Sequence, residues 1–182
     1  MNASTRVKRR NRKPPASKSL KSSPAFKVLF SPKGGISKEL SRLTQAAAKE
    51  INVAAYAFSS KYLGKALVSA MKRGIKVRVI LDFDIARKSY SIDEWLIENG
   101  IDVRFIKLKR GCLHHKFMII DGSRLISGSY NYTNDSEFRN YEAAIFIDAT
   151  PNTFPCTASS AVDLIAAFAA EFECLWSLAE PR

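Results

Sequence analysis

The stretch "INVAAYAFSSKYLGKALVSAMKRGIKVRVILD", residues 51–82, places a helical pattern between two apolar strand patterns. Residues 51–58 and 75–82 are short, mostly apolar runs that contain Val and Ile, which favour strands. The segment between them repeats apolar residues at helical spacing, and Gly74 is placed to end that helix. Two strands joined through a helix predict a βαβ unit, whose parallel strands are buried on both faces.

The same alternation continues on both sides of this unit. Upstream, "FKVLFSP" (26–32) predicts a strand, and "ISKELSRLTQAAAKE" (36–50) predicts a helix capped by Ser37. Downstream, "SIDEWLIENG" (91–100) predicts a short helix capped by Ser91, and "IDVRFI" (101–106) predicts a strand. Repeated strand–helix–strand steps predict an α/β fold with a largely buried parallel or mixed sheet.

The pattern changes after residue 106. Two strand patterns, 114–121 and 124–129, flank the pair Asp121-Gly122, which favours a tight type I′ hairpin turn. "YEAAIFID" (141–148) adds a strand, and residues 161–178 form a helical pattern. We interpret its apolar face as core packing; a lipid-binding helix is the alternative, but the polar face is acidic and would repel anionic lipid. That apolar face comprises Val162, Ile165, Phe168, Ala169, Phe172, Leu175 and Trp176.

Charge is concentrated at the start of the chain. The 182 residues carry a formal net charge of +12, which predicts an anionic partner, either nucleic acid or an acidic membrane surface. Residues 1–25 hold eight Lys and Arg, no acid and few apolar residues. We predict a disordered basic arm at 1–25 and one domain at 26–182. The arm is either a solubilising tail or a grip for a polyanion.

Targeting signals and cysteines point to the cytoplasm. No apolar run follows the basic stretch as in a secretory signal, and no run is long enough to span a membrane, so we expect a cytoplasmic protein with membrane association unlikely on these grounds. A signal-independent secretion route stays open. Cys112, Cys156 and Cys174 are odd in number and lack metal-ligand spacing, which indicates reduced thiols rather than disulfides or a zinc site.

The hairpin segment gathers polar residues on one face. Side chains alternate along a strand, so His114 and Lys116 point one way and His115 the other. By the same rule Ser129 and Asn131 project together. An imidazole, an ammonium, a hydroxyl and a carboxamide suit a phosphodiester, with Lys116 neutralising its oxygens and His114 acting as nucleophile or acid/base. The alternative is a core hairpin that merely contains polar residues.

The ordered set His114-x-Lys116-x4-Asp121-x6-Gly128-Ser129-x-Asn131 resembles the HKD signature of the phospholipase D superfamily. The segments "FSPKGG", "AAYAFSS", "ALVSAMKRGIKVRVILD" and "NYEAAIFI" are similar to small bacterial Nuc-type endonucleases and to the mitochondrial phospholipase D and Zucchini group. The resemblance runs from about residue 26 to 176. It implies an α/β/α sandwich with a mixed, largely parallel central sheet, the phospholipase D/nuclease-like fold.

The resemblance also implies roles for individual residues. His114 would be the nucleophile that forms a covalent phosphohistidine, and Lys116 and Asn131 would bind the phosphate. Ser129 would be a further phosphate contact, and Glu142 would hydrogen-bond His114 and orient it. Within the same motif, the resemblance makes Asp121 and Gly128 structural. His115 has no role in it.

The chemistry needs a second acid/base that this chain does not supply. Displacement at phosphorus requires a nucleophile on one side and an acid for the leaving oxygen on the other, and His115 points to the wrong face. We therefore expect a homodimer in which two His114 residues meet at a two-fold axis. Paired Lys116 side chains would supply the positive charge, so we expect no metal and no cofactor.

The substrate follows less directly from the sequence. The arm and the basic loops "ARK" (86–88) and "KLKRG" (107–111) favour DNA or RNA, and the short chain leaves little room for an acyl-chain pocket. We therefore expect a metal-independent, non-specific endonuclease acting on DNA, with RNA as a further substrate. One alternative is a phospholipid or cardiolipin hydrolase. The other is a non-catalytic nucleic-acid-binding protein, against which the intact His114, Lys116, Asn131 and Glu142 argue.

Overall fold

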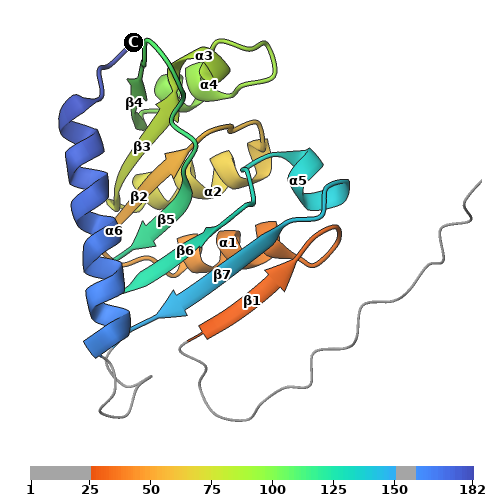
Figure 1. The fold of residues 1–182 in the computed structure, drawn as a ribbon, viewed down its shortest axis with the longest axis vertical. Coiled ribbons are helices and arrows are strands. Elements are labelled where there is room, and N and C mark those ends of the chain that lie inside the picture. The colour runs from red at the N-terminus through yellow and green to blue at the C-terminus, as the bar shows by residue number, and fades with distance from the viewer. Residues whose placement is uncertain (1–25, 151–158) are drawn as a thin grey trace, which may run out of the picture.

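A computed structural model describes residues 26–150 and 159–182, so the predicted arm and Cys156 lie outside the described residues. Figure 1 shows one sheet with helices α1 and α2 on one face and helix α6 on the other. The strands are β1 (Phe26–Phe30), β2 (Glu50–Ala55), β3 (Lys76–Asp82), β4 (Asp102–Ile106), β5 (Lys116–Ile120), β6 (Arg124–Gly128) and β7 (Ala143–Asp148). The helices are α1 (Ile36–Gln45), α2 (Lys61–Lys72), α3 (Phe83–Ala86), α4 (Asp93–Glu98), α5 (Asn134–Phe138) and α6 (Ser159–Leu178). The predicted α/β class and its three layers are confirmed.

The sheet is mixed, in the order β1-β7-β6-β5-β2-β3-β4. β2 pairs in parallel with β3, and β3 with β4, which confirms the βαβ prediction for residues 51–82. The other four pairings are antiparallel. The sheet is mixed, as expected, but most neighbouring strands pair antiparallel, so the expectation that it is largely parallel is wrong for its strand pairings. A tight turn reverses the chain between β5 and β6, and a connection that includes α5 reverses it between β6 and β7. The parallel pairs β2–β3 and β3–β4 are each joined through helices, as parallel neighbours require.

A separate apolar core fills each face of the sheet. On one face α1 and α2 pack through residues such as Leu40 and Leu67 against β2 and β3. On the other face α6 packs through Ile165 and Phe172 against Phe117 of β5 and its neighbours. Burial on both faces explains why the central strands are almost continuously apolar. Among the described residues, none of the helices combines the length and apolar composition that crossing a membrane requires.

Helix α6 is a core helix, as the sequence predicted, apart from one residue. Ile165 and Phe172 are fully buried, and the predicted Phe168, Ala169, Leu175 and Trp176 are partly buried against the same core. Val162 is instead 49% exposed, because Ala161 occupies the buried position in the first turn. Arg78 of β3 fixes the helix: it pairs with Glu173 and its guanidinium carbon lies 4.9 Å from the Phe172 ring centroid.

Two predicted helix caps are wrong. α1 begins at Ile36, and the residue before it is Gly35, whose φ of 78° turns the chain into the helix. The backbone N–H of Ser37 already lies inside the helix and donates to the carboxylate of Glu137 at 2.9 Å. α4 begins at Asp93 after Ile92, so Ser91 stands too early to cap it. In α1 a carboxylate from a distant segment satisfies the N–H that a local cap was expected to serve.

The predicted polar residues lie at one edge of the sheet. Strands β2, β3 and β6 end there, while β5 and β7 begin there, because β5 runs antiparallel to β2 and β7 antiparallel to β6. Lys116 at the start of β5 lies opposite Ala55 at the end of β2, and Gly128 at the end of β6 lies opposite Ala144. The sheet therefore brings residues 114–116 and 128–131 to the same edge.

Candidate active site

The loop that carries His114 is held from two sides. The carboxylate of Asp82, at the end of β3, accepts hydrogen bonds from the backbone N–H of Leu113 at 2.9 Å and of Ile85 at 3.0 Å. The backbone N–H of Tyr56, just after β2, donates to the carbonyl of His115 at 2.9 Å. The exposed imidazole of His114 thus stands on a fixed backbone at the sheet edge.

Tyr56 contacts both groups on which the predicted chemistry depends. Its ring centroid lies 4.6 Å from that of His114, with an interplanar angle of 60°. The ammonium nitrogen of Lys116 lies 4.9 Å from the same Tyr56 ring centroid. A cation over an aromatic face is attracted by the ring quadrupole, so one side chain restrains both the imidazole and the ammonium.

Lys116 is a nearly buried cation, with a relative exposure of 9%. Its ammonium donates to the backbone carbonyl of His114 at 2.7 Å. Burial lowers the pKa of Lys116 from its ordinary value, because the charged form loses hydration, while the nearby negative charge of Glu142 acts in the opposite direction. A partly desolvated ammonium attracts phosphate oxygens more strongly than one in water.

Ser129 and Glu142 bond to each other beside this lysine. The Ser129 hydroxyl donates to the Glu142 carboxylate at 2.5 Å, and the backbone N–H of Ala143 donates to the Ser129 oxygen at 3.1 Å. Asn140 donates to the other carboxylate oxygen at 3.2 Å. In this structure the bonds of Glu142 thus go to Ser129 and Asn140 rather than to His114. The predicted orientation of His114 by Glu142 stays a prediction.

Asn131 lies between two buried tyrosines. The Tyr130 hydroxyl donates to Glu137 at 2.9 Å, and the backbone carbonyl of Tyr132 accepts bonds from the segment that begins α2. Burial raises the pKa of both tyrosines, so they stay neutral. The side-chain oxygen of Asn131 is buried and has no hydrogen-bond partner among the described residues. Its neighbours thus hold the backbone of this segment, while its side-chain oxygen is a buried acceptor that lacks a donor among the described residues.

Asp121 and Gly128 occupy structural positions. Asp121 and Gly122 have φ angles of 56° and 62°, as the predicted type I′ turn requires. The Asp121 carboxylate also accepts hydrogen bonds from the backbone N–H groups of residues 48–50, tying the hairpin to the start of β2. A Cβ on Gly128 would lie 2.1 Å from the carbonyl oxygen of Ala143, so only glycine fits there.

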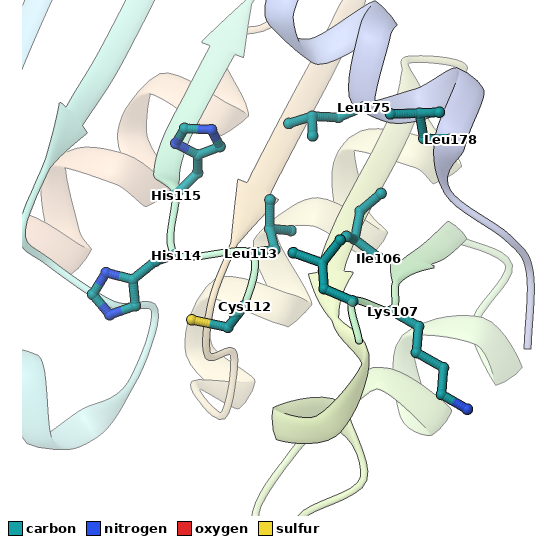
Figure 2. Close-up of a pocket in the computed structure, with 9 residues that line it drawn as sticks. Ile106, Lys107, Cys112, Leu113, His114, His115, Leu175 and Leu178 are labelled. Carbon is teal, nitrogen blue, oxygen red and sulfur yellow. The ribbon is translucent and has the colours of Figure 1, made fainter. Parts of the chain in front are cut away.

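His115 points away from His114. Its Nε2 lies 3.2 Å from a carboxylate oxygen of Glu171 on α6, and its ring packs 5.5 Å from that of Phe117. Figure 2 shows the two imidazoles on different sides of the loop. The two side chains separate as predicted, although both residues lie in the loop before β5, which begins at Lys116.

An apolar cleft of about 590 Å³ opens beside His114 (Figure 2). Its walls are mostly aliphatic and come from the loop after β4 and the end of α6: Ile106, Lys107, Leu108, Cys112, Leu113, His114, His115, Leu175 and Leu178. The volume falls within the range of about 300–1,000 Å³ typical of small-molecule sites. The sequence indicated little room for an acyl-chain pocket, but it did not reveal that α6 ends over this loop and walls a cleft of this size.

The two predicted basic loops converge on one aromatic ring. The guanidinium carbon of Arg87 lies 5.5 Å from the Phe83 ring centroid, and the ammonium of Lys107 lies 4.7 Å from it. Lys88, Lys109 and Arg110 are exposed in the same two loops. Because Lys107 also lines the cleft beside His114, this cationic surface adjoins the candidate site.

Sequence reasoning missed three residues that shape the site: Tyr56, Asp82 and Glu137. Asp82 and Glu137 are almost fully buried carboxylates, 4% and 5% exposed. The signal for Asp82 was a lone acid at the end of an apolar strand, and Glu137 gave none because its partners are distant in sequence. Within residues 26–150 and 159–182, no three His, Cys, Asp or Glu side chains converge in a way that could hold a metal ion.

The chain resembles known proteins over most of its length. A family model described as cardiolipin synthase, PLD-like domain, matches residues 40–176. A phospholipase D of Rickettsia felis is 34% identical over 119 residues, which is 65% of this chain and 59% of the relative. A mitochondrial cardiolipin hydrolase of Mus musculus is 34% identical over 145 residues, 78% of this chain and 60% of the relative. The chain thus spans only about three fifths of these curated relatives.

A solved structure covers the fold more completely. Nuc of Salmonella typhimurium, a phospholipase D family member, superimposes with a TM-score of 0.74 and 26% identity, covering 85% of this chain and 95% of Nuc. NucT of Helicobacter pylori superimposes with a TM-score of 0.72 at 20% identity, which supports the fold alone. The family resemblance stated from the sequence is confirmed by these comparisons.

Proposed function

Because this chain belongs to the phospholipase D-like domain family, we propose that it is a metal-independent phosphodiesterase, an endonuclease acting on DNA and also on RNA. The observation that carries the proposal is the convergence of the two basic loops on Phe83 beside the His114 and Lys116 edge. A cationic surface of this kind tracks a polyanionic backbone without reading its sequence.

The proposed reaction has two displacements at phosphorus. A nitrogen of His114 attacks phosphorus, the bond to the leaving oxygen breaks, and His114 of the partner subunit gives that oxygen a proton. The same partner imidazole then takes a proton from water, whose oxygen attacks phosphorus and releases His114. Each cycle consumes one water and leaves both imidazoles as they began.

The polar residues stabilise the charge that develops in both steps. The partly desolvated ammonium of Lys116 neutralises non-bridging oxygens, and the side-chain N–H of Asn131 donates to the same phosphate. Ser129 joins them by turning its hydroxyl proton from Glu142 to the phosphate. The restraint of Lys116 by Tyr56 supports the role of the lysine. The site is half complete in one chain, so the proposal requires a homodimer with the site at its two-fold interface.

A phospholipid phosphodiesterase is the second candidate function. The aliphatic cleft beside His114 favours it, because hydrocarbon walls suit an acyl chain, whereas bases of single-stranded nucleic acid stack on aromatic rings. The same phosphate chemistry would serve either substrate. A non-catalytic nucleic-acid-binding protein would need neither the tyrosine contact with His114 nor the buried lysine.

The decisive experiment compares substrates in the absence of divalent metal. Purified protein in EDTA is incubated with plasmid, single-stranded DNA, RNA and vesicles containing cardiolipin or phosphatidylcholine. We expect cleavage of the nucleic acids, and none by His114→Ala, while His115→Ala, the matched control at the neighbouring position, stays active. Faster turnover of lipid than of nucleic acid would identify the protein as a phospholipid phosphodiesterase. Equal DNA binding by wild type and His114→Ala, with no cleavage of any substrate, would identify a binding protein.

A further inference from the structure

A second cavity, of about 490 Å³, is lined mainly by polar and aromatic side chains. Its walls come from the residues that begin α2, from the loop after α3 together with α4, and from the first residue of α5. The start of α2 lies between α4 and α5 (Figure 1). The volume is typical of a small-molecule site, and the polar lining distinguishes this cavity from the aliphatic cleft beside His114.

The cavity lies near the aromatic ring that contacts His114. Tyr90, one of its lining residues, is 54% exposed. Burial is the main cause that raises the pKa of Tyr56, and Tyr90 lies near enough to raise it further through its charge. The Tyr56 ring centroid is in turn 4.6 Å from that of His114. A strand whose phosphate is held at His114 therefore has this cavity within reach of a neighbouring nucleotide.

A second connection runs through the segment after β6. Asn134, which lines the cavity, stands three residues after Asn131, the proposed phosphate contact. Between them, the backbone carbonyl of Tyr132 accepts hydrogen bonds from the N–H groups of residues 59 and 60, at 3.0 and 2.9 Å. The segment that carries the phosphate contact is thus bonded to the start of the α2 wall.

The α4 wall is also held in place. The backbone N–H of Ile92 donates to the carbonyl of Phe58 at 3.1 Å. Trp95 packs against Gly64 of α2, where a Cβ would lie only 3.0 Å from its ring atom Cζ3. Because both contacts belong to the folded chain itself, the cavity is formed before any ligand arrives.

Two polar groups in the cavity have no partner. Glu94 pairs with Arg182 at 2.9 Å, whereas Glu98, one turn later on α4, has neither an ion pair nor a hydrogen bond within the described part of the chain. The hydroxyl oxygen of Ser91 is buried and likewise lacks a partner among the described residues. Buried polar groups usually form hydrogen bonds, so the cavity is equipped to bind a polar ligand.

We infer that this cavity, which we call the base pocket, binds one nucleobase of a single strand next to the phosphate at His114, with a preference for guanine. Tyr90 and Trp95 supply aromatic surface on which a base stacks. The two oxygens of Glu98 can together accept the N1–H and the 2-amino group of guanine. No other base presents two adjacent donor groups on that edge.

The inference rests on the proposed function for the presence of a nucleic-acid strand. It adds a choice of base, which the cationic loops do not provide because they contact phosphates alone. The polar and aromatic lining of the base pocket is an observation independent of that function.

Other ligands fit the base pocket less well. Glu94 and Glu98 would repel a phosphate group, and an acyl chain would leave the polar walls without hydrogen bonds. A quaternary ammonium head group suits carboxylates and aromatic rings. It forms no hydrogen bonds, however, and would leave the buried hydroxyl of Ser91 unpartnered.

Binding of oligonucleotides in the His114→Ala background tests the pocket apart from catalysis. Fluorescence anisotropy compares labelled oligothymidine with the same strand carrying one central guanine, adenine or cytosine. Glu98→Gln removes the charge and keeps the shape, and Tyr90→Leu removes the ring. The matched controls are Asp102→Asn, exposed at the start of β4 on the opposite sheet edge, and Tyr62→Leu, 53% exposed on α2 outside the pocket.

We expect the guanine strand to bind about tenfold more tightly than oligothymidine, as one two-bond contact to a base provides. The ratio should fall to about one in Glu98→Gln and Tyr90→Leu, with folding verified by circular dichroism, and stay at about ten in both controls. Equal affinity for all four strands, or a guanine preference that persists in either pocket variant, would overturn the inference. A change in tryptophan fluorescence with choline but none with guanosine would also overturn it and assign the cavity to a cationic head group.

Cleavage by the protein with His114 intact separates this inference from the proposed function. In EDTA, cuts in oligothymidine with one guanine should fall mainly at one fixed distance from the guanine, and Glu98→Gln should spread them evenly. A guanine preference in binding with no hydrolysis would leave the base pocket standing and refute the proposed function alone. Even cleavage together with equal binding would refute the base pocket alone.

Discussion

The ring of Tyr56 lies edge-on to the imidazole of His114, with 4.6 Å between the two centroids, and also lies 4.9 Å from the ammonium of Lys116. These contacts connect the end of β2 to the start of β5, two strands that pair antiparallel. The proposed nucleophile and the proposed phosphate-binding cation thus share one aromatic neighbour.

Loss of this ring should slow catalysis without unfolding the protein. We expect Tyr56→Leu to lower kcat about tenfold to a hundredfold, because misplacing a reacting group by about 1 Å can cost this much. Tyr56→Phe should stay near wild type, since ring contacts and the cation interaction do not require the hydroxyl. Steady-state kinetics over a range of pH check this. A Tyr56→Leu enzyme with unchanged kcat and an unchanged pH profile would show that the ring only fills space.

Mixing experiments should reveal the shared site. If both His114 residues of a dimer are needed, excess His114→Ala protein will form inactive mixed dimers with wild-type chains. We expect the activity per wild-type chain to fall in proportion to the wild-type fraction after subunit exchange. In the same mixture with His115→Ala, the activity per total chain should equal that of wild type alone, because His115 bonds to Glu171 away from the site. Constant activity per wild-type chain in the His114→Ala mixture would mean that each chain works alone.

The buried lysine should oppose stability at neutral pH. Burial lowers the pKa of Lys116 in the folded chain below its ordinary value of 10.5. At pH values between the lowered pKa and 10.5, the unfolded chain therefore binds more protons than the folded chain. The free energy of unfolding contributed by Lys116 therefore rises as pH increases through that window, while activity falls as the ammonium is lost. In denaturant unfolding, the free energy of unfolding of wild type should rise relative to that of Lys116→Met as the pH approaches 10.5.

A charge control separates this effect from general titration. Lys72→Met removes an exposed lysine at the far end of α2, and its difference from wild type should stay flat over the same pH range. A flat difference for Lys116→Met as well would mean that this lysine is not desolvated in the folded protein.

Salt dependence should identify the basic loops as part of the substrate surface. Each lysine or arginine that contacts a phosphate adds about one to the slope of log affinity against log salt. We expect Lys107→Ala and Arg87→Ala each to reduce that slope by about one for DNA binding. Lys72→Ala, on the opposite end of the molecule, should leave it unaltered. Fluorescence anisotropy with labelled DNA and the inactive His114→Ala background measures this; equal slopes for all variants would remove the loops from the interface.

Local patterns predicted much of this protein because the interactions concerned are local. The βαβ unit at residues 51–82 follows from periodicity, and the hairpin turn follows from the positive φ that Asp121 and Gly122 adopt. The separation of His114 from His115 was predicted from strand alternation, and it is found in the extended residues just before β5. The cap predicted at Ser37 failed because a carboxylate far along the chain, that of Glu137, took the place of a local partner.

The sequence by itself determined which segments form the strands and the longer helices, and it predicts which residues carry the proposed phosphate chemistry, because spacing and side-chain type act within a few residues. Only the tertiary structure decided that the sheet pairs mainly antiparallel, that Tyr56 meets His114, that Phe83 gathers two basic loops, and that Val28 and Ile145 stay half exposed. Each of these depends on segments distant in sequence, whose pairing is set by which apolar surfaces the whole chain can bury together.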